Sequence, residues 1–237
     1  MSKFTNREIV PEIIDDFNWS GEDLQKNIEE IEWINKYLGG TKTSVQPVIK
    51  FIQQRSPVQP KPITIVDIGC GSGDVLKNIQ SAFNADKSVS LVGVDANLNI
   101  IDFALSHHFT DNKISFVHAD VMNQEELIPQ ADVYMMNLFL HHFEMTEIKS
   151  LLGHLLSKTP QLVVINDLQR SPLAYHLFGA LCRIQNASEV TKNDGKLSIL
   201  KGFNKAEMRD IGQMVQGYQM HLKWQWAFRW QLLLTKI

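Results

Sequence analysis

Apolar residues recur along this chain at two spacings, and the spacings predict its elements. Over residues 24–38 they recur every three or four positions, which is the pattern of an amphipathic helix. A second helical pattern covers about 44–54. Prolines end it, since they disfavour a continuing helix. The first 62 residues are therefore predicted to form an N-terminal helical cap and a linker that contains Pro57, Pro60 and Pro62.

From Ile63 onward, short apolar runs alternate with helical patterns. This alternation predicts a parallel sheet wrapped by helices. Continuously apolar runs such as 162–165 are typical of strands that are buried on both faces. Strands are predicted at 63–69, 90–95, 114–119, 131–137 and 161–167, and helices at 74–84, 97–108, 144–157, 171–185 and 204–216.

The last part of the chain has a different pattern. Residues 186–199 are polar, which predicts a loop. Residues 218–227 and 228–236 are rich in aromatic residues, and they are too close together for a crossover helix, so they are expected to pair as antiparallel strands. The predicted class is α/β: a doubly wound, Rossmann-like, seven-stranded sheet with an antiparallel last strand, over residues 63–237, beside the N-terminal helical cap.

Composition narrows the classes of protein. The chain has 237 residues, 44% of them hydrophobic and 21% charged, with a net charge of −3, so it has no basic excess that would favour nucleic acid as a partner. It has no apolar run of membrane-spanning length and no leader-like start, so no membrane span and a cytoplasmic location are expected. Cys70 and Cys182 lack metal-ligand spacing and are expected to be free thiols, with no metal site.

The stretch 63–74 indicates a nucleotide cofactor. A β-prone run leads into Gly69, Gly71 and Gly73, and a helical pattern follows. Glycines let the backbone turn with positive φ and let a ligand approach main-chain N–H groups where a Cβ would intrude. Glycine-rich turns of this kind also serve nicotinamide and flavin enzymes, so the turn alone leaves the cofactor open.

Three carboxylates make the interpretation more specific. Asp95 ends the second strand, where it could accept hydrogen bonds from ribose hydroxyls or cap a helix. Asp120 ends the third strand, where with Val121 it could bind the edge of an adenine or form a turn. Asp67 lies inside an apolar strand, where an unpaired charge is costly, so it is expected to meet a cation such as a cofactor ammonium, or loop amides.

Four motifs in order resemble those of class I S-adenosylmethionine-dependent methyltransferases, and the resemblance covers residues 63–237. The glycine spacing departs from that of dinucleotide-binding loops, and the terminal hairpin resembles the antiparallel seventh strand of this family. The motifs are Val66-Asp67-Ile68-Gly69-Cys70-Gly71-Ser72-Gly73-Asp74, Val94-Asp95, Ala119-Asp120-Val121 and Asn137-Leu138-Phe139-Leu140-His141-His142.

This resemblance implies roles for individual residues around S-adenosylmethionine. The three glycines would pass under its methionine part, with Asp67 near the ammonium, and Asp95 would take the ribose. Ala96 or Asn97 would flank the adenine, Asp120 and Val121 would bind its edge, and Asn137 and Leu138 would lie beside the methyl group. Ligands of open α/β sheets bind at this edge, where the parallel strands end.

The acceptor is expected to be a small, apolar or aromatic molecule, methylated at oxygen or carbon. The Asn/Asp-Pro-Pro-aromatic motif of amino methyltransferases is absent at Asn137, and the run 138–142 is similar to methyltransferases of ubiquinone and menaquinone biosynthesis. The run 166–174 also resembles bacterial enzymes found with polyketide synthases. The apolar positions of 173–181 would suit an acceptor site, but they would equally suit a helix facing the core, which is the preferred interpretation.

Methyl transfer is a direct displacement at an activated sulfonium and depends mainly on positioning. A phenolic acceptor would benefit from a base, and His141 or His142 is a candidate; alternatively, His142 caps the next helix. The N-terminal helices could form a lid, with Phe17, Trp19, Trp33 or Tyr37 facing the acceptor, or could simply pack on the sheet edge.

Two other functions compete with this interpretation. One is a nicotinamide-dependent oxidoreductase, which the glycine spacing disfavours. The other is a non-catalytic cofactor-binding module of the same fold, against which the intact Asp95 and Asp120 positions argue. The sequence leaves the identity of the acceptor and the oligomeric state unknown.

Overall fold

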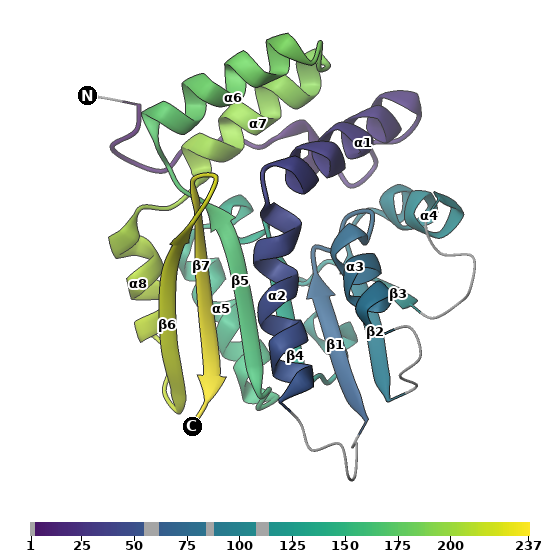
Figure 1. Ribbon diagram of the computed structural model, residues 1–237, viewed down its shortest axis with the longest axis vertical. Helices are drawn as coiled ribbons and strands as arrows, with labels where there is room; N and C mark the ends of the chain where they lie inside the picture. Colours follow the sequence, from purple (N-terminus) through teal and green to yellow (C-terminus); the bar gives the residue numbers. More distant parts are fainter. Residues whose placement is uncertain (1–2, 55–61, 84–87, 108–113) are drawn as a thin grey trace.

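The computed structural model describes residues 3–54, 62–83, 88–107 and 114–237, and its described strands form one mixed sheet of seven (Figure 1). The order is β3-β2-β1-β4-β5-β7-β6, with β1 to β5 parallel and β7 antiparallel to both of its neighbours. The predicted α/β sheet and the antiparallel hairpin are confirmed. The strands are β1 (Ile63–Ile68), β2 (Val89–Asp95), β3 (Ile114–His118), β4 (Val133–Asn137), β5 (Leu162–Leu168), β6 (Tyr218–Gln225) and β7 (Arg229–Lys236).

Helices cover both faces of the sheet and the edge where the parallel strands end (Figure 1). Short 3-10 turns lie at Ile13–Asp15 (η1), Glu125–Leu127 (η2) and Leu140–His142 (η3). The linker prolines Pro57 and Pro60 lie outside the described residues. The α-helices are α1 (Glu22–Tyr37), α2 (Gly40–Gln53), α3 (Asp74–Ala82), α4 (Leu98–His107), α5 (Met145–Ser157), α6 (Pro172–Ile184), α7 (Glu189–Lys201) and α8 (Lys205–Gln213).

Alternate residues of each central strand contribute to two separate cores. Val66, Tyr134 and Ile165 point to the face that α5 and α8 cover. Ile65 and Met135 point to the opposite face, which α2 and α3 cover. All five side chains are buried, as the continuously apolar strands predicted. Helices α1, α6 and α7 lie beyond the ends of the parallel strands, over the edge where ligands of such sheets bind (Figure 1).

Helix α2 begins four residues earlier than predicted, so Pro47 lies in its interior and not in its first turn. A proline there has no N–H for the carbonyl four positions earlier, which belongs to Thr43. That carbonyl instead accepts a hydrogen bond from Nε2 of Gln231, at 2.6 Å. The hydrogen bond that the helix lacks at Thr43 is therefore supplied by a strand that is distant in the sequence. A local sequence pattern does not predict such a partner.

The loop predicted at 186–199 is wrong, because this segment forms most of α7. The Ser188 side chain caps the helix by accepting from the N–H of Thr191 at 3.2 Å. Gly195 lies where the ring of Phe178 in α6 packs, and a Cβ at this position would overlap that ring. The glycine that indicated a loop thus permits two helices to approach closely.

Candidate active site

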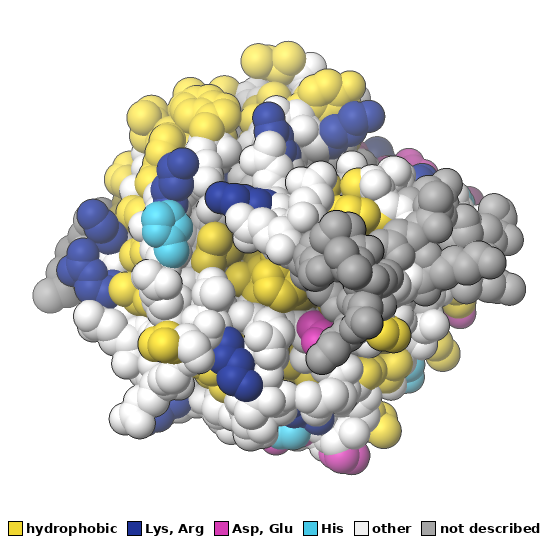
Figure 2. All heavy atoms as spheres, turned by 60° about the horizontal axis from the view of Figure 1, so that its bottom comes forward, with side chains coloured by type: hydrophobic (Ala, Val, Ile, Leu, Met, Phe, Trp, Pro, Cys, Tyr) yellow, Lys and Arg dark blue, Asp and Glu magenta, His cyan; other side chains and the backbone are white. Residues whose placement is uncertain are grey.

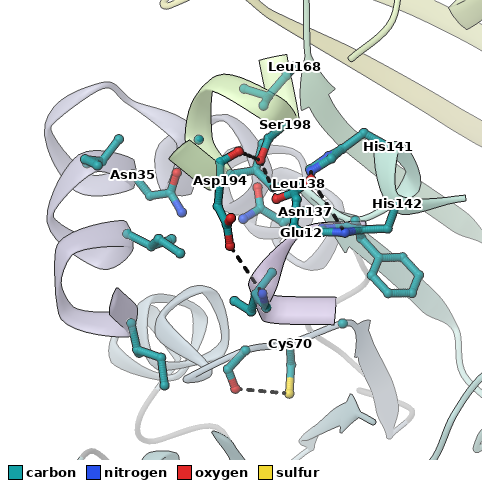
Figure 3. A pocket seen from close by; sticks show the side chains of 18 of the residues that line it. Glu12, Asn35, Cys70, Asn137, Leu138, His141, His142, Leu168, Asp194 and Ser198 are labelled. Atoms are coloured by element: carbon teal, nitrogen blue, oxygen red, sulfur yellow. Dashed lines mark hydrogen bonds and ion pairs between the residues drawn. The ribbon is translucent and has the colours of Figure 1, made fainter. Parts of the chain in front are cut away.

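A cavity of about 660 Å³ opens at the ends of β1, β2 and β4, beneath α1, α6 and α7 (Figure 3). Its floor is the glycine loop after β1, and its far wall comes from η1 and α1. Nearly all the predicted cofactor residues line it. They are Asp67, Gly69, Gly71, Asp95, Ala96, Asn97, Asp120, Val121, Asn137 and Leu138. Gly73 does not line the cavity; it precedes α3 as its N-cap residue, with φ +76°.

The glycine loop has the backbone that a close ligand approach requires. Gly69 and Gly71 have φ of +66° and +54°, in the left-handed region that favours glycine. A Cβ on Gly69 would overlap the ring of Phe139, whereas a Cβ on Gly71 would meet no atom within 4 Å. The backbone between β1 and α3 is therefore left open toward the cavity at Gly71.

Asp67 is a buried carboxylate, and none of the described residues pairs a cation with it. It is 1% exposed, and its Oδ1 atom has no hydrogen-bond partner among the described residues. Burial, with the nearby charges of Asp74 and Asp95, raises its pKa well above the ordinary value. A bound cation would lower that pKa and stabilise the ionised form. The orphaned oxygen therefore fits the ammonium group of an amino-acid cofactor.

Asp95 holds the loop and the start of α4 together. Its Oδ2 accepts from the N–H of Gly71 at 2.9 Å, and its Oδ1 accepts from the N–H of Asn97 at 3.0 Å. Burial raises its pKa, although these backbone hydrogen bonds oppose the shift. The carboxylate keeps further lone pairs and lines the cavity, so the expected ribose contact and the cap-like contact are compatible.

Asn97 and Asp120 have local roles in addition to lining the cavity. The Asn97 side chain accepts from the N–H of Asn99 at 2.9 Å and donates to the carbonyl of Trp19 at 3.2 Å, so it tethers the N-terminal segment to α4. Asp120 accepts from the N–H of Met122 at 3.0 Å, as in the alternative turn interpretation. Val121 is buried beside it.

Asn137 is held by two neighbours at the end of β4. Its Oδ1 accepts from Oγ of Ser44 and from Nδ2 of Asn166, both at 2.7 Å. Leu138 follows with φ +53°, an uncommon conformation for a residue other than glycine. Strained backbone of this kind clusters at functional sites, and here it directs the chain into η3.

His141 forms a buried pair with Asp167. Its Nδ1 lies 2.8 Å from Oδ1 of Asp167, so this nitrogen carries the proton when the ring is neutral. Burial would raise the pKa of Asp167, but the charge and hydrogen bond of His141 outweigh burial and lower it. The other ring nitrogen, Nε2, lies 3.7 Å from Oε1 of Glu12 and is left as an acceptor beside the cavity (Figure 3).

His142 is different, because it is paired with the N-terminal segment. Its Nδ1 lies 2.6 Å from Oδ1 of Asp15. Burial alone would lower the pKa of His142, but the hydrogen bond to Asp15 and the charges of Glu12 and Asp15 outweigh burial and raise it. The alternative in which His142 caps α5 is wrong, since Glu144 is the N-cap residue and forms a capping box with Glu147.

Glu12, His141 and His142 place ligand-type atoms within 4.8 Å of one another, a donor set that could hold a metal ion. However, the buried ammonium of Lys201 lies 3.2 Å from Oε1 of Glu12 and 3.2 Å from Oδ2 of Asp15. A cation of the chain itself thus already balances these carboxylates. The expectation that the site uses no metal stays a prediction.

The N-terminal segment before α1 closes one side of the cavity. Arg7 donates from Nη2 to the carbonyls of His141 and Phe143, each at 2.9 Å, and from Nε to the carbonyl of Lys201 at 2.7 Å. We refer to residues 3–21 as the N-terminal strap. Of the four aromatic residues expected to face an acceptor, Phe17 lines the cavity, whereas Trp19, Trp33 and Tyr37 do not.

One side of the cavity is apolar. In α6, the expectation that most of the stripe over 173–181 packs in the core is wrong. Leu177, Phe178 and Leu181 line the cavity, and Leu173 is 57% exposed. The buried positions of α6 are the small residues Ala174, Gly179 and Cys182, because α7 packs close against this helix. Cys70 and Cys182 are free thiols, as predicted.

Several residues of the site escaped sequence reasoning. Glu12, Asp194 and Ser198 line the cavity near the two histidines, although they are far apart in sequence (Figure 3). Asp167 contacts His141 and Asp15 contacts His142. Ser198 donates to Oε2 of Glu12 at 2.6 Å, and Asp194 accepts from the N–H of Ile13 at 2.9 Å. For Glu12 and Asp15, the one signal was the acidic character of the first 16 residues.

The helices and the surface give no sign of a membrane-spanning or strongly basic region in the parts described below. Of the described residues, no helix is long and apolar enough to cross a membrane. On the face shown in Figure 2, Lys and Arg side chains lie apart, with neutral atoms between them.

Strand order, the antiparallel β7 and the glycine loop at the end of β1 define a class I Rossmann-like methyltransferase fold. Residues 65–158 match the family model of a methyltransferase domain. The chain thus contains a methyltransferase domain with this fold, and solved structures that share the fold were crystallised with SAM or SAH. The unpaired oxygen of Asp67 and the open backbone at Gly71 fit S-adenosylmethionine.

Solved structures share this fold at low sequence identity. The plantazolicin methyltransferase BpumL in complex with SAH is 17% identical, with 91% of this chain and 90% of that chain covered and a TM-score of 0.66. Human N-acetylserotonin methyltransferase in complex with SAM is 15% identical, with 91% and 56% covered and a TM-score of 0.60. The CurJ carbon methyltransferase is 12% identical, with 83% and 54% covered and a TM-score of 0.61. A comparison with curated protein sequences finds no match.

Proposed function

We propose that the chain methylates the hydroxyl oxygen of a small aromatic acceptor, and that His141 is the general base. The observation that carries this proposal is that His141, which lines the cavity, is paired with Asp167. With Nδ1 donating to Asp167, Nε2 is free to accept the proton of an acceptor hydroxyl. The raised pKa of His142 makes this second histidine a poorer base, because it holds a proton more tightly.

The apolar wall supports an aromatic or otherwise apolar acceptor. Leu177, Phe178 and Leu181 of α6 face the same cavity as Phe139 and His141. Pockets of this kind hold small ligands through apolar area and fix their orientation with a few polar groups. The solved structures that share this fold include a plantazolicin methyltransferase, an N-acetylserotonin methyltransferase and a carbon methyltransferase. Their diversity leaves methylation at carbon as the alternative.

Cofactor roles complete the proposal. We assign Asp67, Gly69 and Gly71 to the methionine part of the cofactor. Gly73 would contribute indirectly, by shaping the loop. When bound, S-adenosylmethionine supplies the electrophilic methyl group. Asp95 is assigned to the ribose; Ala96, Asn97, Asp120 and Val121 are assigned to the adenine, and Asn137 and Leu138 to the neighbourhood of the methyl group.

The N-terminal part, residues 1–62, is proposed to act as a cap on the methyltransferase domain, residues 63–237. The strap and α1 support this role, because they line the cavity through Glu12, Phe17 and Ile28. Excluding water from the site would favour transfer to the acceptor over side reactions. Helix α2 shares a core with β1 and β4, so the two parts would not fold independently.

The experiment is a screen followed by a base test. Purified protein with S-adenosylmethionine is incubated with phenols, quinones and aromatic polyketides, and products are analysed for a gain of one methyl group. We expect a phenol to gain it at oxygen. Asp167→Asn should then lower kcat roughly 100-fold or more, because the wrong tautomer of His141 would be favoured.

The matched control is Asp102→Asn, an exposed aspartate on α4. Both variants should bind S-adenosylhomocysteine as the wild type does. Unchanged turnover in both Asp167→Asn and His141→Ala would refute a general base at this position. A product methylated at carbon would establish the alternative.

A further inference from the structure

Arg229, the first residue of β7, is a buried cation whose donors are mostly unused. It is 2% exposed and lines the cavity. Its Nη2 donates to Oδ1 of Asn35 at 3.1 Å. Its Nε and Nη1 atoms have no hydrogen-bond partner among the described residues. Leaving buried donors of a charged group unpaired is costly, so such a group in a native fold calls for a partner that the chain does not supply.

The surroundings of Arg229 add positive potential. The guanidinium packs against Gly40, where a Cβ would lie 2.9 Å from its Cζ atom. Gly40 begins α2, a helix of 14 residues whose first turn contains no acidic residue and whose N-cap, Gly39, provides no side-chain cap. A helix N-terminus carries a partial positive charge. The N-terminus of α2 thus adds to the positive potential at Arg229. The Asp74 carboxylate also reaches this turn, where its Oδ2 accepts from Oγ1 of Thr41 at 2.9 Å.

The nearest carboxylates do not neutralise Arg229. Burial lowers the pKa of Arg229 to about 10, and the charges of Asp167 and Asp74 only partly oppose this shift. Asp167 is paired with His141, and no described residue forms an ion pair with Arg229. The excess positive charge at Arg229 therefore remains available to a ligand.

Asp67 is the negatively charged counterpart of Arg229. It is a buried carboxylate with an unpaired oxygen, and it lines the same cavity. The charge of Asp74 acts on both groups, raising the pKa of Asp67 and that of Arg229, so all three lie in one neighbourhood. An unpaired anion and an unpaired cation in one cavity match a zwitterion, that is, a group with an ammonium and a carboxylate.

We propose that Arg229 binds the carboxylate of a molecule held in this cavity, through its unpaired Nε and Nη1 donors. Two molecules could bring a carboxylate: the cofactor, with its amino-acid end, or the acceptor. Asp67 favours the cofactor. For the cofactor, the inference rests on the assignment of Asp67 to the methionine part. Guanidinium and carboxylate groups form paired, charge-assisted hydrogen bonds, which give both affinity and orientation.

Calorimetric titration tests the cofactor as the source. The probes are S-adenosylhomocysteine and its decarboxylated analogue, which retains the amine. In Arg229→Met, which keeps a long side chain without charge, we expect affinity for S-adenosylhomocysteine to fall roughly 10- to 100-fold and affinity for the analogue to stay unchanged. Arg229→Lys should lie between the wild type and Arg229→Met, because it keeps the charge but loses the paired geometry.

A second titration tests the acceptor as the source. Benzoate and benzamide are titrated into protein saturated with S-adenosylhomocysteine. If Arg229→Met leaves S-adenosylhomocysteine binding intact but abolishes a benzoate affinity that benzamide lacks, the carboxylate belongs to the acceptor. If neither titration depends on Arg229, the proposal is overturned.

Thermal unfolding of the ligand-free variants separates binding from a structural role. Because Nε and Nη1 of Arg229 have no partner among the described residues and Nη2 bonds only Asn35, Arg229→Met should unfold at a temperature close to that of the wild type. A lower temperature, with equal losses of affinity for both cofactor probes, would assign Arg229 to structure and overturn the proposal.

Three other variants, Arg229→Lys, Asp95→Ala and His141→Ala, are titrated with the same probes. If Arg229→Met does not fold, the comparison of Arg229→Lys with the wild type decides: an unchanged preference for S-adenosylhomocysteine over its analogue, together with unchanged benzoate binding, overturns the proposal. Asp95→Ala should weaken both cofactor probes equally, and His141→Ala should weaken neither. Failure of the proposed base is thereby distinguished from failure of the carboxylate site.

Discussion

His141 and His142 are adjacent in sequence but have different partners, because their side chains contact different carboxylates. His141 donates to Asp167 of β5, which belongs to the sheet. His142 contacts Asp15 of the strap, which also receives the ammonium of Lys201. A ring that pairs with the sheet and a ring that pairs with the strap thus lie side by side, with centroids 4.2 Å apart. Their roles follow from their neighbours and not from residue type.

The Asp15–His142 pair predicts a pH-dependent contribution to stability. The pKa of His142 is raised, so its contribution is full below about 6.5 and is lost as pH rises through the folded-state pKa. Hydrogen bonding and charge from His142, with Lys201, outweigh burial and lower the pKa of Asp15, so its contribution is present above about 3.9 and is lost as pH falls through its folded-state value. The pair is therefore most stabilising between about pH 4 and 6.5.

Asp15→Asn should lower the free energy of unfolding by about 1–3 kcal/mol within that window, and by less as pH rises above it. Chemical denaturation from pH 4.5 to 9 measures the difference. Asp16→Asn is the control, since the exposed side chain of Asp16 accepts only from the N–H of Asn18 among the described residues. A deficit for Asp15→Asn that grows with pH would contradict the assigned ion pair.

At the scale of elements, the strap and α7 form the site together with η3. Arg7 fastens the strap to three carbonyls of the chain, and its guanidinium lies 4.3 Å from the centre of the Phe203 ring. Glu12 and Asp15 then reach Lys201, at the end of α7. The strap has few buried apolar side chains, so it is held against the rest of the chain mainly by these polar contacts.

Arg7→Ala should therefore release the strap without unfolding the sheet. Three carbonyls would lose a charged donor, and the backbone amides of Ile13 and Ile14, which donate to Asp194, should exchange hydrogen roughly 10- to 100-fold faster. Hydrogen exchange measured by mass spectrometry checks this outcome. Glu8→Ala, in the same strap, should leave their exchange unchanged, because the Glu8 side chain contacts only the N–H of Ile9. Equal protection in both variants would mean that Arg7 does not hold the strap.

At the scale of the whole molecule, residues from both ends of the chain line the cavity. Its lining runs from Glu12 in the strap to Arg229 in β7. A ligand that binds the folded form alone stabilises the whole molecule by mass action. Binding should therefore be visible as a shift of global unfolding.

S-adenosylhomocysteine at 100 times its dissociation constant should stabilise the fold by about 2.7 kcal/mol, and the unfolding temperature should rise accordingly. NAD at the same concentration should produce no shift, because the glycine loop and Asp67 suit an amino-acid cofactor and not a pyrophosphate. Differential scanning fluorimetry compares the two ligands. A shift with NAD alone would contradict the cofactor assignment.

Local patterns in the sequence determined the sheet, its buried strands and the cofactor edge. Continuous apolar runs predicted central strands such as β4 and β5, and glycines before a helical pattern predicted the loop at Gly69. These signals are local, because burial and backbone conformation act on neighbouring residues. Where a distant partner decides the conformation, prediction failed: Gln231 satisfies the carbonyl left free by Pro47, and Phe178 of α6 packs at Gly195 of α7.

The sequence by itself determined the fold class and the position of the glycine loop after β1, and it singled out the two candidate histidines. Only the tertiary structure decided that His141 pairs with Asp167, that His142 pairs with Asp15, and that Arg229 lies in the cavity with two donors unpaired among the described residues. The physical reason is that protonation state and ligand affinity depend on charges and hydrogen-bond partners within a few ångströms. In this chain those partners lie 26, 127 or 194 positions away in sequence: Asp167 from His141, Asp15 from His142, and Asn35 from Arg229.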